Sequence, residues 1–177
     1  SYEMHGIKYL LRKLLRIELQ QHPKVPSQLR DDILILLNSL LDLLNTKKNL
    51  LNKIAINMQT IQIHLLNENE EVIENLIITN QRIIDDISLY NYSISNIVKI
   101  ITLKIGVEYN EFEKFLLNLK HPIVNSILDN MDTINIITKR LSNLNETITI
   151  LLKKHQDLIL KNIHEINKII ELQYTIS

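Results

Sequence analysis

The residues best suited to hold a metal ion are the six histidines, His5, His22, His64, His121, His155 and His164. Helical metal sites take two ligands from one helix, three or four residues apart, and add carboxylates from neighbouring helices. The pairs Glu18/His22 and His64/Glu68 have this spacing, but neither belongs to a repeated Glu-x-x-His pattern. Isolated pairs of this kind arise often by chance on charged helices, so we predict no metal site.

Signatures of nucleophiles and of phosphate binding are also missing from the sequence. The chain has no cysteine and only two glycines, which excludes thiolate chemistry, a disulfide framework and a glycine-rich phosphate loop. No Gly-x-Ser-x-Gly motif occurs. Adjacent acidic residues such as Asp85 and Asp86 point to different sides of a helix, so they do not form an acid/base pair. We therefore predict a non-enzyme with no catalytic residues and no cofactor.

The elements that would position any site are long amphipathic helices. Apolar residues recur in alternating steps of four and three, which is the spacing of a helix that buries one seam against other helices. The first seam is Ile33, Leu37, Leu40, Leu44, Leu51, Ile54, Met58, Ile61 and Leu65, and its one skipped position is Lys47. The second is Ile73, Ile77, Asn80, Ile84, Ile87, Asn91, Ile94, Val98, Ile101 and Ile105. The third is Ile127, Met131, Ile134, Ile137, Leu141, Leu144, Ile148, Leu151, His155, Ile159, Ile163, Ile166 and Ile170.

The boundaries of these helices follow from prolines, a glycine and turn residues. The long helices are predicted over about 28–66, from a turn at 67–71 to about 105, and over about 122–174, with Gly106 as a C-cap and Pro122 in a first turn. A short helix is predicted over 110–119. Another short helix, basic and amphipathic, is predicted over 7–20, and two prolines follow it.

These elements predict an all-α fold, an elongated antiparallel bundle of three long helices plus a short N-terminal helix with coiled-coil-like packing. We expect a single helical-bundle domain over 1–177. Within it, residues 1–26 hold the short basic helix and a proline-containing linker, and residues 27–177 form the long-helix bundle. Asn80 and Asn91 on the second seam are interpreted as residues that fix the register between helices.

Charge and hydropathy narrow the classes of partner that we expect for this chain. The formal net charge is zero, so no global field draws the chain onto nucleic acid or an anionic membrane. Polar residues interrupt every apolar stretch before it reaches transmembrane length, so no membrane span is predicted. The absence of cysteine suits a reducing compartment, and we expect the protein to be cytoplasmic.

Three segments carry a resemblance to a known family. Residues 36–51 read LLNSLLDLLNTKKNLL, residues 64–84 read HLLNENEEVIENLIITNQRII, and residues 152–170 read LKKHQDLILKNIHEINKII. Over about residues 30–172 the chain resembles bacterial flagellar export chaperones of the FlgN type. The resemblance implies a cytoplasmic protein that keeps hook–filament junction subunits soluble and escorts them to the export apparatus.

The same resemblance implies where a client would bind. The last amphipathic helix would engage a helical client through its apolar face, made of Ile159, Ile163, Ile166 and Ile170. Two alternatives remain open: a coiled-coil scaffold that self-associates as a homodimer, and a sensory or ligand-binding four-helix bundle. A chaperone predicts that these isoleucines are exposed in the isolated chain, a scaffold predicts that a symmetric dimer buries them, and a sensor predicts a polar pocket between helices.

Overall fold

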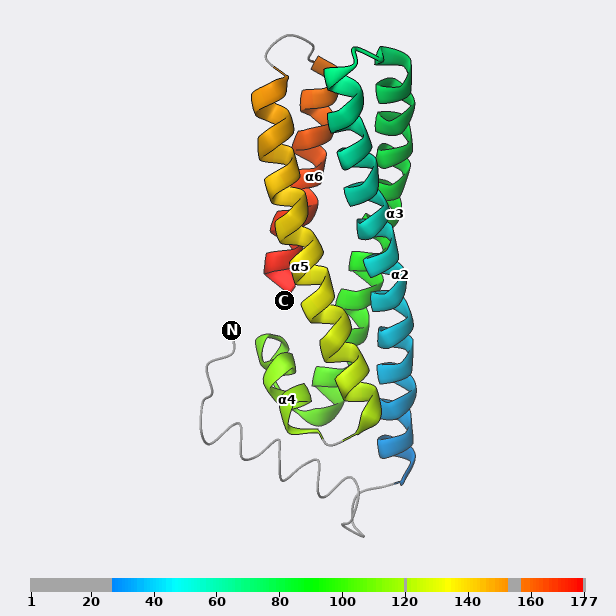
Figure 1. The fold of residues 1–177 in the computed structure, drawn as a ribbon. Coiled ribbons are helices and arrows are strands. Elements are labelled where there is room, and N and C mark those ends of the chain that lie inside the picture. The colour runs from blue at the N-terminus through cyan, green and yellow to red at the C-terminus, as the bar shows by residue number, and fades with distance from the viewer. Residues whose placement is uncertain (1–26, 120, 153–156, 177) are drawn as a thin grey trace. The chain divides into compact units, whose positions relative to one another are not determined.

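The computed structural model describes residues 27–119, 121–152 and 157–176, and Figure 1 shows their helices. Among these residues there are helices and no strands, which confirms the predicted all-α class. The helices are α2 (Ser27–Leu66), α3 (Glu70–Ile105), the short 3₁₀ helix η1 (Tyr109–Glu111), α4 (Phe112–Asn118), α5 (Pro122–Leu151) and α6 (Asp157–Ile176). The helix predicted over 7–20 lies outside the described residues.

The first two seams are the buried faces of α2 and α3. On α2 every seam residue is buried except Leu65, which is half-buried near the helix end. On α3 all ten seam residues are buried, including Asn80 and Asn91. The skipped position on α2 is buried as well, because Lys47 is only 1% exposed. Apolar spacing therefore identifies the inward face of both helices, and the lysine belongs to that face.

The prediction that the third long helix is continuous is wrong. The sequence predicts one helix over about 122–174, but α5 ends at Leu151 and α6 begins at Asp157. At the end of α5, Leu152 is buried and Leu151 is 41% exposed, so the inward face shifts by one residue there. No glycine or proline follows Pro122, but residues 153–157 read KKHQD, a run of five polar residues that interrupts the apolar spacing at this break. Packing of the segments on the other helices overrides their local preference for one helix.

Both ends of α3 adjoin residues with a left-handed backbone. Gly106 has φ 70°, and the amides of Gly106 and Val107 donate to the carbonyls of Leu103 and Thr102 at 3.3 and 3.0 Å. This is the hydrogen-bond pattern of a Schellman C-cap, and it confirms the predicted role of the glycine. Glu68 occupies the corresponding position after α2, with φ 57°.

The described chain divides into two compact units. Unit 1 contains the described residues up to Leu44 together with Ser93–Met131, and unit 2 contains Asn45–Tyr92 and Asp132–Ile176. Each unit therefore takes parts of α2, α3 and α5. Unit 1 also includes α4, and unit 2 includes α6. The predicted single domain stays a prediction.

Unit 1 has an aromatic centre on α4. Phe112 and Phe115 are buried, with ring centroids 6.4 Å apart, on the short helix that the sequence predicts over 110–119. Leu116, on the same face, is fully buried. At the start of α5, the amide of Ile123 donates to His121 Nδ1 at 3.1 Å, so this histidine acts as an N-cap.

Candidate functional site

The four isoleucines with a predicted partner-binding role share one buried face of α6. Ile166 is 0% exposed, and Ile159, Ile163 and Ile170 are between 6 and 7% exposed. The prediction that they are exposed in the isolated chain is therefore wrong. The reason is the break after α5, since it allows α6 to pack on the rest of unit 2 (Figure 1). Their role in partner binding stays a prediction.

We define the groove as the surface of α2, α3 and α5 within unit 2 that α6 covers. Hydrogen bonds between side-chain amides mark this contact. In the first set, Asn57 Nδ2 on α2 donates to Asn80 Oδ1 on α3 at 2.9 Å. Asn80 Nδ2 lies 3.4 Å from Asn162 Oδ1 on α6 and 3.5 Å from the sulfur of Met58. One polar layer therefore links three helices.

A second layer contains the buried lysine. Lys47 Nζ on α2 donates to Gln173 Oε1 on α6, and Gln173 Nε2 donates to Asn135 Oδ1 on α5 at 3.4 Å. The hydrogen bond between Asn57 and Asn80 fixes the antiparallel register of α2 and α3. Lys47 lies ten residues before Asn57 on α2, and Asn91 lies eleven residues after Asn80 on α3. Because the helices are antiparallel, Asn91 lies within one helical turn of Lys47 along the helix axes.

A third contact joins α5 and α6 directly, because Asn145 Nδ2 donates to Asn167 Oδ1 at 3.1 Å. With the other two layers, α6 bonds to α2 and α5 through Gln173, to α3 through Asn162, and again to α5 through Asn167. We call these three contacts the amide layers. All of them lie in unit 2.

The amide layers do not satisfy all their polar atoms. Asn162 Nδ2 and Asn145 Oδ1 are buried with no hydrogen-bond partner among the described residues. Asn91 is more extreme, because neither polar atom of its buried side chain has a partner there. A buried, unsatisfied polar group costs about 1–3 kcal/mol. The α6 contact is thus less stable than an apolar contact of the same size would be.

Lys47 adds an electrostatic cost to this contact. Burial lowers the pKa of Lys47 from its ordinary value of 10.5 to about 8, because the ammonium loses its hydration. The ammonium donates to the neutral amide of Gln173, which does not compensate the charge as a carboxylate would. At neutral pH the groove therefore holds a cation that favours contact with water.

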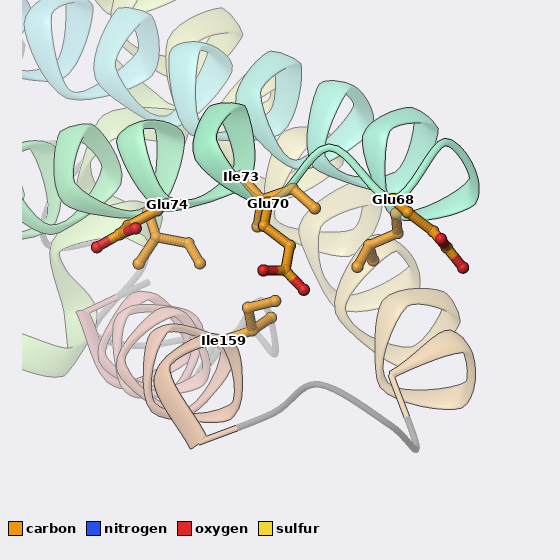
Figure 2. Close-up of a pocket in the computed structure, with 7 residues that line it drawn as sticks. Glu68, Glu70, Ile73, Glu74 and Ile159 are labelled. Atoms are coloured by element: carbon orange, nitrogen blue, oxygen red, sulfur yellow. The ribbon is translucent and has the colours of Figure 1, made fainter.

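A small pocket lies at the end of unit 2, beside the turn from α2 to α3. Its volume is about 220 Å³, and it is lined by Leu65, Glu68, Glu70, Ile73, Glu74, Ile77 and Ile159. Figure 2 shows Glu70 and Ile159 pointing toward one another across it, and Glu68 and Glu74 pointing to either side. An apolar floor with carboxylates at its edge is suited to a small group with a positive charge and an apolar body.

Three of the six histidines lie in the described part of the chain. His121 caps α5, His164 is exposed on α6, and His64 is half-buried. Glu68 lies beyond the end of α2, so it and His64 do not share a helix face. In the described part of the chain, no group of three or more acidic or histidine side chains is placed to hold a metal ion. His5, His22 and His155 lie outside it.

Sequence reasoning missed most of the amide layers. It identified Asn80 and Asn91 because they fall on the second seam, but not the amides of α5 and α6. Gln173 was detectable in principle, because it lies three residues after Ile170, the last isoleucine of the third seam. Asn57, Asn135 and Asn162 have no such signal, since each lies beside its seam rather than on it.

Two wider observations complete the description of the site. Within residues 27–119, 121–152 and 157–176, every helix is too short or too polar to cross a membrane. Comparison with protein-family models, with curated proteins and with solved structures finds no match to this chain.

Proposed function

We propose that this chain is a non-enzymatic chaperone that binds an amphipathic helix of a client protein at the contact between α6 and the groove. The observation that carries the proposal is the nature of this contact. It buries a full apolar face of α6, yet it includes a buried cation and amides with unsatisfied atoms. Such a helix is well packed, but its separation from the groove costs less free energy than the separation of a helix held by apolar contacts alone.

The mechanism is masking of an apolar stripe. A client helix that enters between α6 and the groove would cover Ile159, Ile163, Ile166 and Ile170 on one side and the apolar groove on the other. This is helix-in-groove recognition, in which apolar residues three or four apart act as anchors. A client covered in this way neither aggregates nor assembles early.

The finer identity of the client comes from the resemblance alone. By that resemblance the client is a hook–filament junction subunit, the process is flagellar protein export, and the location is the cytoplasm. The coiled-coil-like packing of the predicted bundle and its short N-terminal helix belong to the same proposal. The net charge of zero suits a protein whose partner is another protein rather than nucleic acid.

A reversible lock on α6 tests the proposal. The side chains of Asn145 and Asn167 meet at 3.1 Å, and the chain has no cysteine of its own. A disulfide in the double variant Asn145→Cys, Asn167→Cys would hold α6 on α5, and peptide mass spectrometry must first show that oxidation forms it. The locked and the reduced forms of this variant serve as baits in a lysate of the source organism. A double variant to serine is the control that no oxidant can lock.

The proposal expects a partner on the reduced bait that is absent from the locked bait and returns when reductant is added. Cross-linking must place an amphipathic helical segment of the partner beside α6. The serine control must capture the partner under both redox conditions. Equal capture by the locked and reduced baits would place the partner on another surface and contradict the proposal. No specific partner on the reduced bait would also contradict it.

The pocket beside the α2–α3 turn favours a second candidate, a ligand-binding bundle. Its small volume and three glutamates would suit a compact organic cation rather than a larger molecule. Titration with a series of small amines, followed by calorimetry, tests this candidate. Saturable binding that Ile73→Trp abolishes would support it, whereas binding that added salt removes completely would indicate attraction to surface charge only.

A further inference from the structure

We propose that the pocket beside the α2–α3 turn holds a lysine or arginine side chain of the client, which positions the client at the end of α6. The inference rests on the proposed function, because it names the chemistry by which the same client is recognised. It also identifies a surface that the client can contact while α6 still covers the groove.

The first argument is the position of the pocket. Its lining includes Ile159, the first isoleucine of the α6 face, together with Ile73 and Ile77 of the buried α3 seam. The apolar floor of the pocket is therefore continuous with the contact between α6 and the groove, and all of its lining residues belong to unit 2. A client that enters between α6 and the groove at this end of α6 contacts the pocket first.

The second argument is the size of the pocket. Its volume of about 220 Å³ lies below the range of about 300–1,000 Å³ that is typical of sites for drug-sized ligands. An α-helix with its side chains is about 10–12 Å across, so a whole helix does not fit into this volume. A pocket of this size is suited to one long side chain.

The third argument is the chemistry of the lining. Four apolar side chains form the floor, and the exposed carboxylates of Glu68, Glu70 and Glu74 surround it. Glu70 points toward Ile159 across the pocket, so a negative charge faces the apolar floor (Figure 2). Lysine and arginine carry a cationic end on an aliphatic stem, and they bury the stem on apolar surface while the charge stays in water. Both parts of such a side chain therefore find a complementary surface here.

The fourth argument concerns the source of the cation. Ion pairs between exposed groups contribute little free energy on their own, and a free amine has only the pocket to bind. A side chain of the client is held near the pocket by the contacts of the client with α6, so its effective concentration there is high. Exposed leucines also adjoin the lining in sequence, because Leu66 follows Leu65 and Leu160 follows Ile159. They offer further apolar contact to a protein partner.

Short peptides test the pocket itself. The first probe is acetyl-Leu-Lys-Leu-amide, and its uncharged control carries norleucine in place of lysine. Butylamine is the third probe, because it has the same cationic end without a peptide. Each probe is titrated into the chain, and NMR follows the methyl resonances of Ile73, Ile77 and Ile159. We expect saturable shifts with the lysine peptide, and affinities at least about threefold lower for the norleucine peptide and for butylamine.

Two pairs of substitutions locate the charge that matters. Glu70→Gln with Glu74→Gln removes two carboxylates of the pocket. The matched control is Glu71→Gln with Asp86→Asn, which removes two exposed carboxylates of α3 that do not line the pocket. The pocket pair should weaken binding of the lysine peptide at least about threefold, and the control pair should not. Equal affinities for the lysine and norleucine peptides, or equal effects of the two pairs, would overturn the proposal.

The two proposals fail separately in these experiments. The lysine peptide should bind the chain whose α6 is held by the 145–167 disulfide as well as the reduced chain, because the pocket is present while α6 is packed. The reduced bait should capture less client with the pocket pair than with the control pair. Equal capture by both would remove this inference and leave the chaperone. Binding of the lysine peptide without a client on any bait would remove the chaperone and favour the ligand-binding bundle.

Discussion

Helices α3 and α6 both bury one apolar face in unit 2, but the two faces differ in their extent and in the partners of their buried polar residues. The α3 face contains Asn80 and Asn91 within a seam of ten residues over 36 positions. The shorter α6 face, over 20 positions, buries Asn162 and Gln173 among its isoleucines, and Gln173 meets the buried lysine. Within unit 2 each helix buries two amides among seven described buried residues, so the polar share is equal; the difference is that α3 continues into unit 1, whereas α6 lies wholly in unit 2. Helix α6 is therefore the helix of unit 2 that we expect to leave first.

The largest expected effect comes from the centre of the α6 face. Ile166→Ala should lower the free energy of unfolding by about 2–5 kcal/mol, because a fully buried isoleucine loses its contacts and leaves a cavity. Ile136→Ala is the matched control, since Ile136 is 67% exposed on α5 and should change stability by less than about 0.5 kcal/mol. Urea denaturation measures both. Equal effects would mean that α6 does not pack as described.

The buried lysine should make stability depend on pH. Its pKa is about 8 in the folded chain and near 10.5 when unfolded, so between these values the unfolded chain binds more protons. Stability therefore rises with pH across this window, by on the order of 3 kcal/mol, as the cost of the buried charge disappears. Lys47→Met removes this titration, whereas Lys53→Met, at an exposed position of α2, retains it.

The measurement is the difference in unfolding free energy between the wild type and each variant at pH 7 and pH 10. For Lys47→Met we expect the wild type to gain stability relative to the variant as the pH rises. For Lys53→Met the difference should stay constant. A constant difference for both variants would show that the Lys47 ammonium is hydrated in the folded chain.

Replacing the facing amides of α3 and α6 by apolar side chains should change the stability of their contact. The double variant Asn80→Leu, Asn162→Leu replaces both facing amides by apolar groups. Its free energy of unfolding should exceed the mean of the two single variants by about 1–2 kcal/mol. Each single variant leaves one amide without its partner across the layer. A double-mutant cycle by thermal unfolding measures the coupling. Additive effects would show that Asn80 and Asn162 do not interact.

The smallest expected effects come from the helix ends. Gly106→Ala should destabilise by about 1–2 kcal/mol, because alanine is strained at φ 70° although no neighbouring atom obstructs its Cβ. Glu68→Gly should stabilise by about 0.5–1 kcal/mol, because relief of the same strain exceeds the cost of the entropy that glycine adds to the unfolded chain. Thermal melts measure both. Effects of the same sign would contradict the left-handed conformation at one of the two positions.

The sequence was sufficient for features that repeat along a helix. Steps of three and four residues identify the inward faces of α2 and α3, and Gly106 and Pro122 mark helix ends because their backbones are restricted. The break between α5 and α6 has one signal in the sequence, the polar run KKHQD over 153–157, but where α6 then packs depends on contacts between distant segments. For the same reason the sequence shows Lys47 as an interruption of a seam, while its bond to Gln173 requires the folded chain.

Hydrogen exchange of the backbone amides tests most directly whether α6 opens separately from the rest of unit 2. We predict that amides near Ile163 and Ile166 exchange at least about tenfold faster than those near Ile84 and Ile87 on α3, since local opening needs less free energy than global unfolding. The disulfide between cysteines at 145 and 167 should slow exchange in α6 selectively. Equal protection of α6 and α3, unchanged by the disulfide, would show that unit 2 opens only as a whole and would contradict a separately released α6.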